Sequence, residues 1–254
     1  RLPRISNFTD IAPLEAVDEL DVSYVSNISQ FGDPDVVIIP GSKNTISDLL
    51  WMRQNGLEGK ILRHAAKGGI VFGICGGYQM LGQSISDPTG AEQKGTVRGM
   101  GLLPVTTVFE QEKRRTRVSG RFAEVGGALA EMSGVCYEGY EIHMGRTVLS
   151  KGTVPLVYME EEGEQRQDGA QSDHVYGCYM HGIFDMSETV KTFLAAVLRK
   201  KGIDPSKITV RDRNAYKEEQ YDRLASIVRE NLNMEAVYKI IEKGNEASCS
   251  LLSE

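Results

Sequence analysis

The stretch GGIVFGICGGYQMLG, residues 68–82, decides the fold class of this 254-residue chain. Its first part, Gly69–Ile74, is a short run of β-branched and other apolar residues, which predicts a strand. The run breaks into a turn made almost wholly of glycine, and a helix is predicted from Gly77 to about Ser84. A strand that passes directly into a helix is the repeating unit of a parallel α/β sheet.

The residues on the N-terminal side of this stretch show the same alternation. Val22–Val25 and Val36–Pro40 are short β-branched runs, and both are predicted to be strands. The second run has no polar alternation, as expected of a strand that is covered on both faces. Thr45-x-x-Asp48 resembles a capping box, with aspartate in place of the more usual glutamate. A helix is therefore predicted over Ile46–Gln54, with its start near Thr45.

After Gly99 the pattern changes to shorter and more alternating runs, which predict antiparallel strands added at an edge of the mostly parallel sheet. These runs are Leu103–Phe109, Thr116–Phe122, Tyr140–Met144, Val154–Glu160 and His174–Met180. From Ser187 the pattern becomes helical and ends in basic residues and glycine, as helix C-termini favour.

Three segments are distinguished along the chain. Residues 1–200 are predicted to form the α/β domain. Residues 201–247 are predicted to be a helical appendage of the same domain, with helices over about Lys217–Glu230 and Met234–Lys243. Residues 248–254 are predicted to be a disordered tail.

The composition limits the partners and the compartment. Lys and Arg number 29 against 35 Asp and Glu, a net charge of −6, so nucleic acid is not expected as a partner. No signal peptide and no apolar run of membrane-spanning length is found, so a cytoplasmic protein without membrane contact is predicted. The cysteines at positions 75, 136, 178 and 249 show no C-x-x-C pairing, which predicts free thiols and no metal site.

Cys75 stands on the glycine turn, in Gly73-Ile-Cys-Gly-Gly77. A strand that ends in such a turn and continues as a helix is typical of a nucleophile elbow, in which the side chain projects above the sheet. The helix N-terminus places N–H dipoles beside the sulfur, which favours the reactive thiolate, and the N–H of Gly76 becomes a candidate oxyanion donor. The alternative is a small buried hydrophobic residue, the interpretation given to the other three cysteines.

A thiolate nucleophile needs an acid–base partner, usually histidine. His181 ends a predicted strand and is followed at once by glycine, at the sheet edge where ligands gather in open α/β sheets, so it ranks first. His143, within GYEIHMG, ranks second. His64 is interpreted as a solvated side chain of a basic helix, and His174 begins a strand.

The preceding predicted strand also ends in glycine, in Pro40-Gly41-Ser42. A glycine there lets a second backbone N–H approach a tetrahedral intermediate, and two donors complete an oxyanion hole. The alternative is an ordinary loop between a strand and a helix.

Four motifs taken together resemble a known family: PGSKNTISDL, GICGGYQMLG, GYEIHMG and YMHGIF, in this order. They are similar to the class I glutamine amidotransferase domain of the cobyric acid synthase and cobyrinate diamide synthase group. The resemblance covers residues 1 to about 200 and implies a flavodoxin-like α/β fold. The opening RLPRISNFTD and the closing YDRLASIVRENLNMEAVYKII are similar to the C-terminal half of the cobyric acid synthases.

The resemblance implies roles for individual residues. Cys75 corresponds to the nucleophile and His181 to its acid–base partner. Further roles implied by position are oxyanion donors at Gly41 and Gly76, substrate contacts at Gln79 and Ser42, and accessory residues at Tyr140, Glu141 and His143. The implied reaction is hydrolysis of glutamine through a γ-glutamyl thioester, with ammonia as the useful product.

One position departs from the wider class. Most class I amidotransferases carry His-x-Glu, in which the carboxylate orients the imidazole, but Ile183 stands two residues after His181 here. The cobyric acid synthase group is similar in lacking this glutamate. An imidazole without an orienting carboxylate predicts a weak, partner-dependent glutaminase, unless Asp185 or Glu141 substitutes.

Attaching ammonia to a carboxylate requires activation by ATP, and no G-x-x-x-x-G-K-[ST] motif is present in the sequence. The opening RLPRISNFTD reads as a chain that leaves a preceding strand, so this sequence is expected to be the C-terminal part of a longer polypeptide. The resemblance implies that a synthetase domain with ATP and magnesium precedes it, and that ammonia amidates carboxylates of adenosylcobyrinic acid a,c-diamide.

Other functions stay open at this point. Related ligases of the same group amidate cobyrinic acid at its a- and c-carboxylates or amidate a cell-wall lipid precursor. A cysteine hydrolase of the elbow type would need an acidic residue between nucleophile and histidine, for which Asp87, Glu124 and Asp173 are candidates. A non-catalytic module is disfavoured by the intact cysteine, histidine and glycine turns.

Overall fold

The computed structural model describes residues 1–161, 163–210 and 213–250. The chain divides into two compact units, Arg1–Arg211 and Asp212–Glu254. The first unit carries all the predicted site residues and is described first. Within the described residues, no helix combines the length and the apolar character that a membrane span requires.

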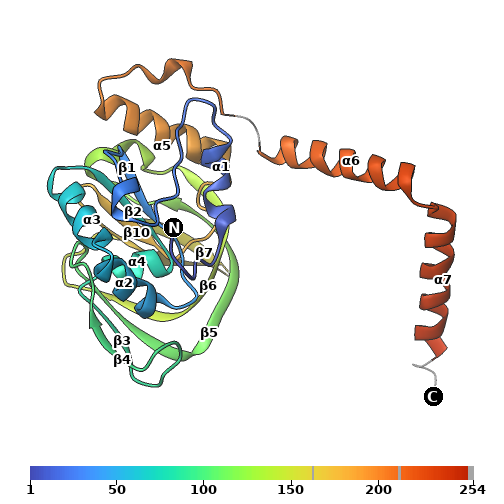
Figure 1. The fold of residues 1–254 in the computed structure, drawn as a ribbon, viewed down its shortest axis with the longest axis horizontal. Helices are drawn as coiled ribbons and strands as arrows, with labels where there is room; N and C mark the ends of the chain where they lie inside the picture. Colours follow the sequence, from blue (N-terminus) through green and yellow to red (C-terminus); the bar gives the residue numbers. More distant parts are fainter. Residues whose placement is uncertain (162, 211–212, 251–254) are drawn as a thin grey trace. The chain divides into compact units, whose positions relative to one another are not determined.

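A four-stranded sheet lies at the centre of the first unit, with strand order β1-β2-β10-β9 (Figure 1). β1 (Val36–Ile39) and β10 (Val175–Cys178) both run parallel to β2 (Ile70–Ile74), while β9 (Ala170–Ser172) closes one edge antiparallel to β10. All five residues of β2 are buried, as its uninterrupted apolar sequence predicts. The prediction that His174–Met180 is an antiparallel addition is wrong, because β10 pairs in parallel with the central strand.

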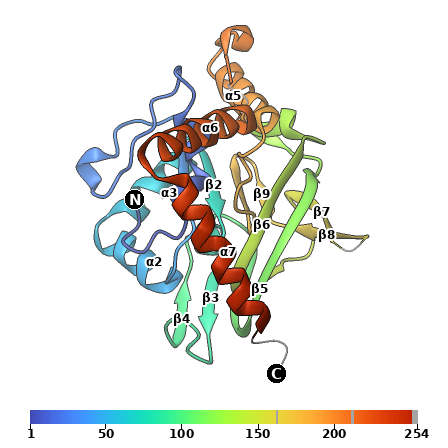
Figure 2. The ribbon, with the colours of Figure 1, turned by 90° about the vertical axis from the view of Figure 1, so that its right-hand side faces the viewer.

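Helices cover both faces of this sheet. α2 (Thr45–Gln54) and α3 (Leu57–Ala66) group on one side of β2, as Figure 2 shows. On the other side, Phe72 of β2 packs edge-on against Phe193 of α5 (Ser187–Lys200), with ring centroids 6.5 Å apart. α2 begins at Thr45 as predicted, but the capping side chain is Asn44, whose oxygen accepts a 3.0 Å hydrogen bond from the Ser47 N–H.

The strand-rich part of the chain forms a second sheet, rather than edge strands of the first. Its core is the long antiparallel pair β5 (Val105–Phe122) and β6 (Cys136–Leu149), with an irregularity in the register between Phe109 and Arg114. The order is β4-β3-β5-β7-β8, with β6 on β5. The remaining strands are β3 (Ser84–Asp87), β4 (Gly95–Arg98), β7 (Val157–Glu161) and β8 (Glu164–Asp168).

The first 35 residues contain little regular structure. Residues 22–25 were predicted to be a strand, but they form no regular element and pair with no strand of the described chain. The short helices of this unit are η1 (Phe8–Asp10), α1 (Ala12–Glu15), η2 (Ile28–Gln30), α4 (Gly76–Leu81), η3 (Gly127–Met132) and η4 (Pro205–Lys207). Leu2, Leu14 and Val17 are nevertheless buried in the core, so this segment is anchored by its apolar side chains.

The second unit consists of α6 (Arg213–Asn231) and α7 (Met234–Ser250). Both helices were predicted and both are longer than expected. Of the predicted tail, residues 248–250 belong to α7, and 251–254 lie outside the described residues. The placement of the domain boundary at residue 200 stays a prediction of the sequence.

Candidate active site

Cys75 occupies a sharp turn between β2 and α4. Its backbone has φ 51° and ψ −108°, a conformation that costs energy in any residue other than glycine. The Cys75 N–H donates a 2.8 Å hydrogen bond to the Cys178 carbonyl of β10, which holds the turn at the carboxyl edge of the sheet. A Cβ at Gly77 would lie 1.9 Å from the Ile39 carbonyl oxygen, so only glycine permits this approach of α4 to β1.

The two glycine turns meet at Cys75. A Cβ on Gly41 would lie 2.9 Å from Cε1 of His181 and 3.6 Å from Cβ of Cys75, and a Cβ on Gly76 would lie 2.9 Å from the Ser42 nitrogen. The loop after β1 therefore packs directly on the first residues of α4. This arrangement brings the backbone of both turns beside one sulfur, as an oxyanion hole requires.

His181 follows β10 and is fully buried. Its backbone pairs with that of Tyr140 through hydrogen bonds of 2.9 and 3.1 Å, and its ring stacks on the Tyr140 ring with centroids 5.3 Å apart. Nδ1 lies 2.7 Å from Oδ2 of Asp10. Because Nδ1 is engaged in this way, Nε2 is the nitrogen left to exchange a proton with Cys75, and it has no hydrogen-bond partner among the described residues.

Asp10 is the carboxylate that orients His181, and the sequence did not single it out. It is 1% exposed and comes from η1, 171 residues before the histidine. Its second oxygen, Oδ1, accepts a 3.0 Å hydrogen bond from the Gly182 N–H, so both oxygens fix the histidine segment. Nδ1 is bonded by Asp10 and not by Glu141, which was considered for this role from the sequence.

The surroundings of His181 favour its charged form. Burial lowers the pKa of the imidazole, but the hydrogen bond to Asp10 and the nearby Cys75 sulfur outweigh burial and raise the pKa to about 10. His181 is thus held as an imidazolium beside Cys75, where it can act as the acid–base partner of a cysteine nucleophile.

Glu141 and His143 lie on β6 and form a separate cluster. The buried Glu141 carboxylate accepts a 3.0 Å hydrogen bond from Arg114 and a second from Arg166. His143 Nε2 lies 3.7 Å from Glu141, and its Nδ1 bonds the Gly145 carbonyl at 2.8 Å. The structure thus places His181 at the elbow and ties His143 to Glu141. The contact of this segment with the thiol is the Ile142 carbonyl, 3.8 Å from Sγ.

Gln79 lies on α4, one turn after Cys75, and is almost fully buried. Its Oε1 accepts a 3.1 Å hydrogen bond from the Thr45 hydroxyl, and its Nε2 donates to the Tyr179 hydroxyl at 3.2 Å. The Ser42 hydroxyl donates to Asp48 at 2.7 Å. The part of Ser42 that lies beside Gly76, and so beside the Cys75 turn, includes its backbone nitrogen.

Glu92 was not singled out from the sequence either. It stands in a loop after β3 whose N–H groups at residues 90–93 donate to the Asp87 carboxylate, all at 2.8–2.9 Å. One oxygen of Glu92 accepts a hydrogen bond from the Thr45 N–H, and the other lies 3.4 Å from the Thr45 hydroxyl that also reaches Gln79. Burial raises the pKa of the Glu92 carboxyl to about 7.

Two other findings bear on the chemistry of the site. Cys75, Cys136 and Cys178 are free thiols, and the side chain of Cys249 lies outside those described. Within the described part of the chain, no group of three or more potential ligands could hold a metal ion. The arrangement of Cys75, His181 and Asp10, with the two glycine turns, is suited to acyl transfer through a thioester.

Comparison with known proteins identifies the family. Residues 1–189 match the CobB/CobQ-like glutamine amidotransferase domain. The chain belongs to this family. The resemblance carried by the four sequence motifs is thereby confirmed.

Curated relatives of this amidotransferase domain are longer than the chain. The cobyric acid synthase of Ruminiclostridium cellulolyticum is 51% identical over 250 residues, which are 97% of this chain and 49% of that protein. The cobyric acid synthase of Lachnoclostridium phytofermentans is 43% identical over 254 residues, which are 96% and 50% of the two chains. The chain spans about half the length of these relatives and corresponds to their C-terminal half.

Solved structures are similar to the amidotransferase domain in fold. PurLQS from Thermotoga maritima superposes with a TM-score of 0.58 at 18% identity, over 79% of this chain and 96% of that chain. A structure described as a glutamine amidotransferase gives 0.50 at 16% identity, over 76% and 91%. Likeness at these identities concerns the fold alone, and it confirms the predicted α/β amidotransferase fold.

Proposed function

We propose that this domain hydrolyses glutamine at Cys75 and supplies the ammonia to a synthetase portion of the same polypeptide, in a protein that acts as a cobyric acid synthase. The observation that carries the proposal is the buried contact of Asp10 with His181, which completes a Cys-His-Asp constellation on the nucleophile elbow. The family and the relatives identify glutamine as the substrate to test first.

In the first half of the reaction, the Cys75 thiolate attacks the carbon of the glutamine side-chain amide. A C–S bond forms while the carbonyl π electrons move to oxygen, and the resulting oxyanion is held by N–H groups of the two glycine turns at Gly41 and Gly76. The tetrahedral intermediate collapses when its C–N bond breaks. His181, as imidazolium, gives its Nε2 proton to the departing nitrogen, which leaves as ammonia.

In the second half, water hydrolyses the γ-glutamyl thioester. The now neutral His181 takes a proton from water at Nε2, and hydroxide attacks the thioester carbon. The C–S bond breaks, glutamate is released and the thiolate is restored. Asp10 keeps the other proton on Nδ1 through both halves, so that Nε2 is always the nitrogen that exchanges protons with the substrate.

Asp10 changes the expectation for the activity of the isolated site. The sequence predicted a weak glutaminase because Ile183 replaces the orienting glutamate found in the wider class. A carboxylate from the N-terminal segment fills the same role, 2.7 Å from Nδ1. The absence of a glutamate at position 183 therefore no longer predicts a weak glutaminase. Any dependence of the glutaminase activity on the synthetase portion must have another cause.

The substrate contacts are assigned from the groups beside the elbow. Gln79 is fixed by Thr45 and Tyr179, so its main chain and side chain form a rigid wall of the pocket. Glu92 is a half-buried carboxylate next to this wall, and a carboxylate there pairs with the α-ammonium group of a bound amino acid. A protonated Glu92 would lose this pairing.

The relatives support a proposal for the activity of the whole protein. ATP and Mg²⁺ would bind in the preceding synthetase portion and activate carboxylates of adenosylcobyrinic acid a,c-diamide, which ammonia then converts to amides. Amidation of cobyrinic acid or of a cell-wall lipid precursor is the second candidate within the group. A free thiol at the site suits the reducing cytoplasm, where we expect the protein to act without a membrane or nucleic acid.

Covalent labelling tests the proposal. The full-length protein is treated with a glutamine-analogue diazoketone and its peptides are mapped by mass spectrometry. A single adduct on Cys75 is expected, which disappears in Cys75→Ser and persists in Cys136→Ser, a change at an exposed thiol. Labelling at another residue, or none in an active protein, would contradict the assignment. Acceptor identity is tested separately by amidation assays with the two corrinoid substrates.

A further inference from the structure

Two buried polar atoms face each other on β6 without a hydrogen-bond partner among the described residues: Nε2 of His143 and Oε1 of Glu141. They lie 3.7 Å apart, which is too far for a direct hydrogen bond. The Glu141 side chain is fully buried and the His143 side chain is 10% exposed. Buried polar groups in folded proteins are almost always paired, so these two atoms indicate a position for a small polar ligand.

The surroundings make both atoms acceptors. Nδ1 of His143 lies 2.8 Å from the Gly145 carbonyl oxygen, which can only accept, so Nδ1 carries the proton of the neutral ring and Nε2 presents a lone pair. Burial raises the pKa of the Glu141 carboxyl, but the interactions with His143 and with two arginines outweigh burial and lower this pKa. Glu141 is therefore a carboxylate, and a ligand that fits has to donate two hydrogen bonds at once.

Ammonia meets this requirement. A nitrogen about 2.9 Å from each of two acceptors that are 3.7 Å apart sees them at an angle of about 80°, so two of its N–H bonds reach both with each hydrogen bond bent by about 15°. The second oxygen of Glu141 accepts hydrogen bonds from Arg114 and Arg166, whose positive charges compensate the carboxylate. The pair therefore carries no excess negative charge that would favour ammonium over neutral ammonia, the nucleophilic form.

The two acceptors lie next to the place where ammonia is released. Ile142 stands between them in the sequence of β6, and its carbonyl oxygen is 3.8 Å from the Cys75 sulfur. The His143 ring stacks on the Tyr179 ring with centroids 3.7 Å apart, and the Tyr179 hydroxyl accepts a hydrogen bond from Gln79. His143 is thus joined directly to the wall of the pocket beside the nucleophile.

The other side of the pair leads to the surface of the second sheet. Arg114 of β5, Glu161 of β7 and Arg166 of β8 form a network of ion pairs around Glu141. Their side chains are between 29% and 39% exposed, in contrast to the buried pair. His143 and Glu141 therefore occupy an intermediate position between the thiol and the surface.

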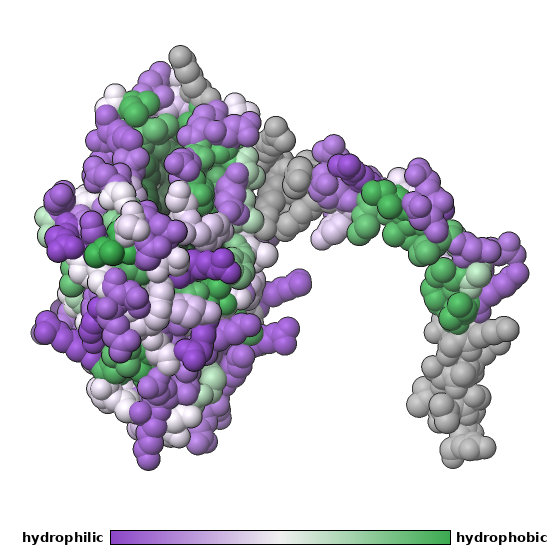
Figure 3. Space-filling view, viewed as in Figure 1, coloured by the Kyte–Doolittle hydropathy of each residue, from purple (hydrophilic) through white to green (hydrophobic). Residues whose placement is uncertain are grey.

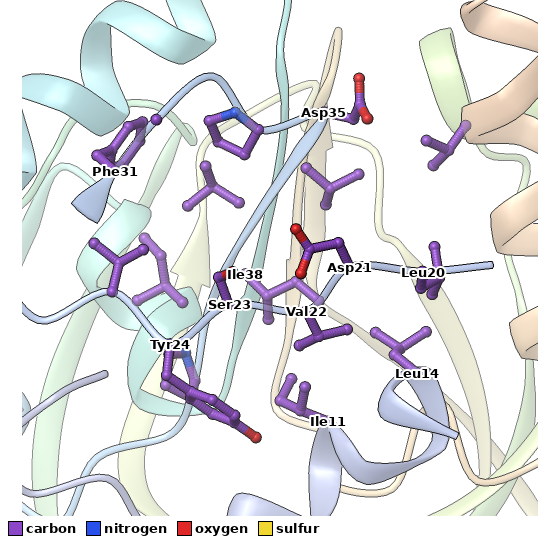
Figure 4. A pocket seen from close by; sticks show the side chains of 18 of the residues that line it. Ile11, Leu14, Leu20, Asp21, Val22, Ser23, Tyr24, Phe31, Asp35 and Ile38 are labelled. Carbon is purple, nitrogen blue, oxygen red and sulfur yellow. The ribbon is translucent and has the colours of Figure 1, made fainter. Parts of the chain in front are cut away.

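A cavity elsewhere in the first unit is separate from this position. It has a volume of about 730 Å³ and lies beside β1, with mostly apolar walls that include Leu14 and Ile38 (Figure 4). In Figure 3, hydrophobic side chains are visible in a hollow on the upper part of this unit. The described lining of the cavity includes neither Cys75 nor His143, so it does not adjoin the place where ammonia forms.

We propose that His143 and Glu141 form a binding site for ammonia, which receives each molecule released at Cys75 and holds it before transfer to the synthetase portion. This inference rests on the proposed glutaminase. Two hydrogen bonds to the site delay the escape of ammonia to solvent, so that hydrolysis of one glutamine yields one amide.

The ratio of amide formed to glutamate released tests the site in the full-length protein. His143→Phe keeps an aromatic ring against Tyr179 but removes Nε2, and Glu141→Gln presents an NH₂ group to His143 while its oxygen stays with the arginines. Each variant should lower the ratio about fivefold, the size of one lost hydrogen bond. His174→Phe is the matched control with an unchanged ratio, because it also loses a hydrogen bond from a ring nitrogen to a backbone carbonyl but stands before β10, at the end of that strand away from Cys75.

Isotope competition separates loss of the site from a general loss of structure. The full-length protein receives glutamine labelled with ¹⁵N in its side-chain amide, unlabelled ammonium chloride, and adenosylcobyrinic acid a,c-diamide as acceptor. The ratio of ¹⁵N to ¹⁴N in the amide product should fall about fivefold in both site variants and stay unchanged in His174→Phe. A variant that is only less well folded would form glutamate and amide more slowly in parallel and keep both ratios. Unchanged ratios in either site variant would overturn the site, because both acceptors are required.

A binding measurement keeps the ammonia site testable apart from the proposed function. In histidine-labelled full-length protein at alkaline pH, the ¹⁵N signal of His143 Nε2 should shift on addition of ammonium chloride and not on addition of sodium chloride. Equal responses to the two salts would overturn the ammonia site and leave the pair to a buried water. If this shift is seen but the unsubstituted protein forms no amide from glutamine, the proposed function fails and the site stands.

Discussion

Replacing Asp10 with asparagine isolates the contribution of one negative charge to the site. The Asp10 carboxylate accepts from His181 Nδ1 at 2.7 Å and from the Gly182 N–H at 3.0 Å, so both of its oxygens act as acceptors. Asparagine offers one acceptor and one NH₂ donor. If its oxygen keeps Gly182, its NH₂ group faces Nδ1 and forces the tautomer that carries the proton on Nε2. That tautomer cannot receive a proton from water.

The size of the effect can be estimated from the geometry. In the Ser-His-Asp triad the equivalent change lowers kcat by about 10⁴-fold. Here the ring is also held by the Tyr140 stack and by two backbone hydrogen bonds, which preserve its position. We therefore expect Asp10→Asn to lower kcat for glutamine by about 10²- to 10³-fold, roughly 3–4 kcal/mol in the activation free energy, with little change in KM.

The assay is release of glutamate by the full-length protein, followed across pH 6 to 10. Asp10→Asn should also lower the pKa of His181 from about 10, because it removes the hydrogen-bonded charge that helps raise it. Glu141→Gln is the matched control, because Glu141 is a buried carboxylate that accepts hydrogen bonds from Arg114 and Arg166 and not from His181. A folded Asp10→Asn protein with kcat within threefold of the unsubstituted protein would refute the reasoning, as would a larger loss in Glu141→Gln.

Three further predictions address other parts of the site. Gly41→Ala places a Cβ 2.9 Å from the His181 ring, so the backbone N–H of residue 41, the second oxyanion donor, should be displaced and kcat should fall by about 100-fold. Gly59→Ala is the control: its Cβ would meet no atom within 4 Å, and glutamate release should be unchanged. Glu92→Gln should raise KM for glutamine by about 10-fold, with kcat within twofold, if this carboxylate binds the α-ammonium group; an unchanged KM would remove Glu92 from the substrate pocket. The raised pKa of His181 stabilises the fold fully below pH 6.5 and progressively less as pH rises towards 10. Urea titrations should show this decline in the unsubstituted protein and a smaller one in His181→Gln; equal declines would contradict the assigned pKa.

The parts of the site that could be predicted from the sequence are those encoded locally. The elbow at Cys75 is visible because a buried strand, three glycines and a helix follow one another within ten residues. Gly41 could be placed beside it because parallel neighbouring strands end at the same edge of the sheet. In both cases a short stretch contains the strand, the turn and the start of the helix.

Asp10 could not be predicted in this way. It lies 171 residues from His181, and nothing in NFTD distinguishes its aspartate from the exposed acidic residues nearby. The segment acquires its role only when η1 packs under the loop after β10. The pairing direction of β10 was missed for a related reason, since the residues of a short apolar strand do not encode whether its neighbour runs parallel or antiparallel.

The prediction for residues 22–25 was wrong for a different reason. Their alternation is that of a strand, but no strand of the described chain pairs with them. An alternating pattern reports the side-chain period of a strand, whereas the strand itself forms only where a neighbouring backbone supplies the hydrogen bonds.

The close approach of Gly77 to the Ile39 carbonyl has a consequence for how this domain can be reused. The spacing between the loop at Gly41 and the start of α4 is set by backbone against backbone, with no side chain between them. Changes of side chains elsewhere on the domain surface leave that spacing unaltered. The geometry of the turn that carries Cys75 is therefore insulated from sequence drift on the surface of the domain.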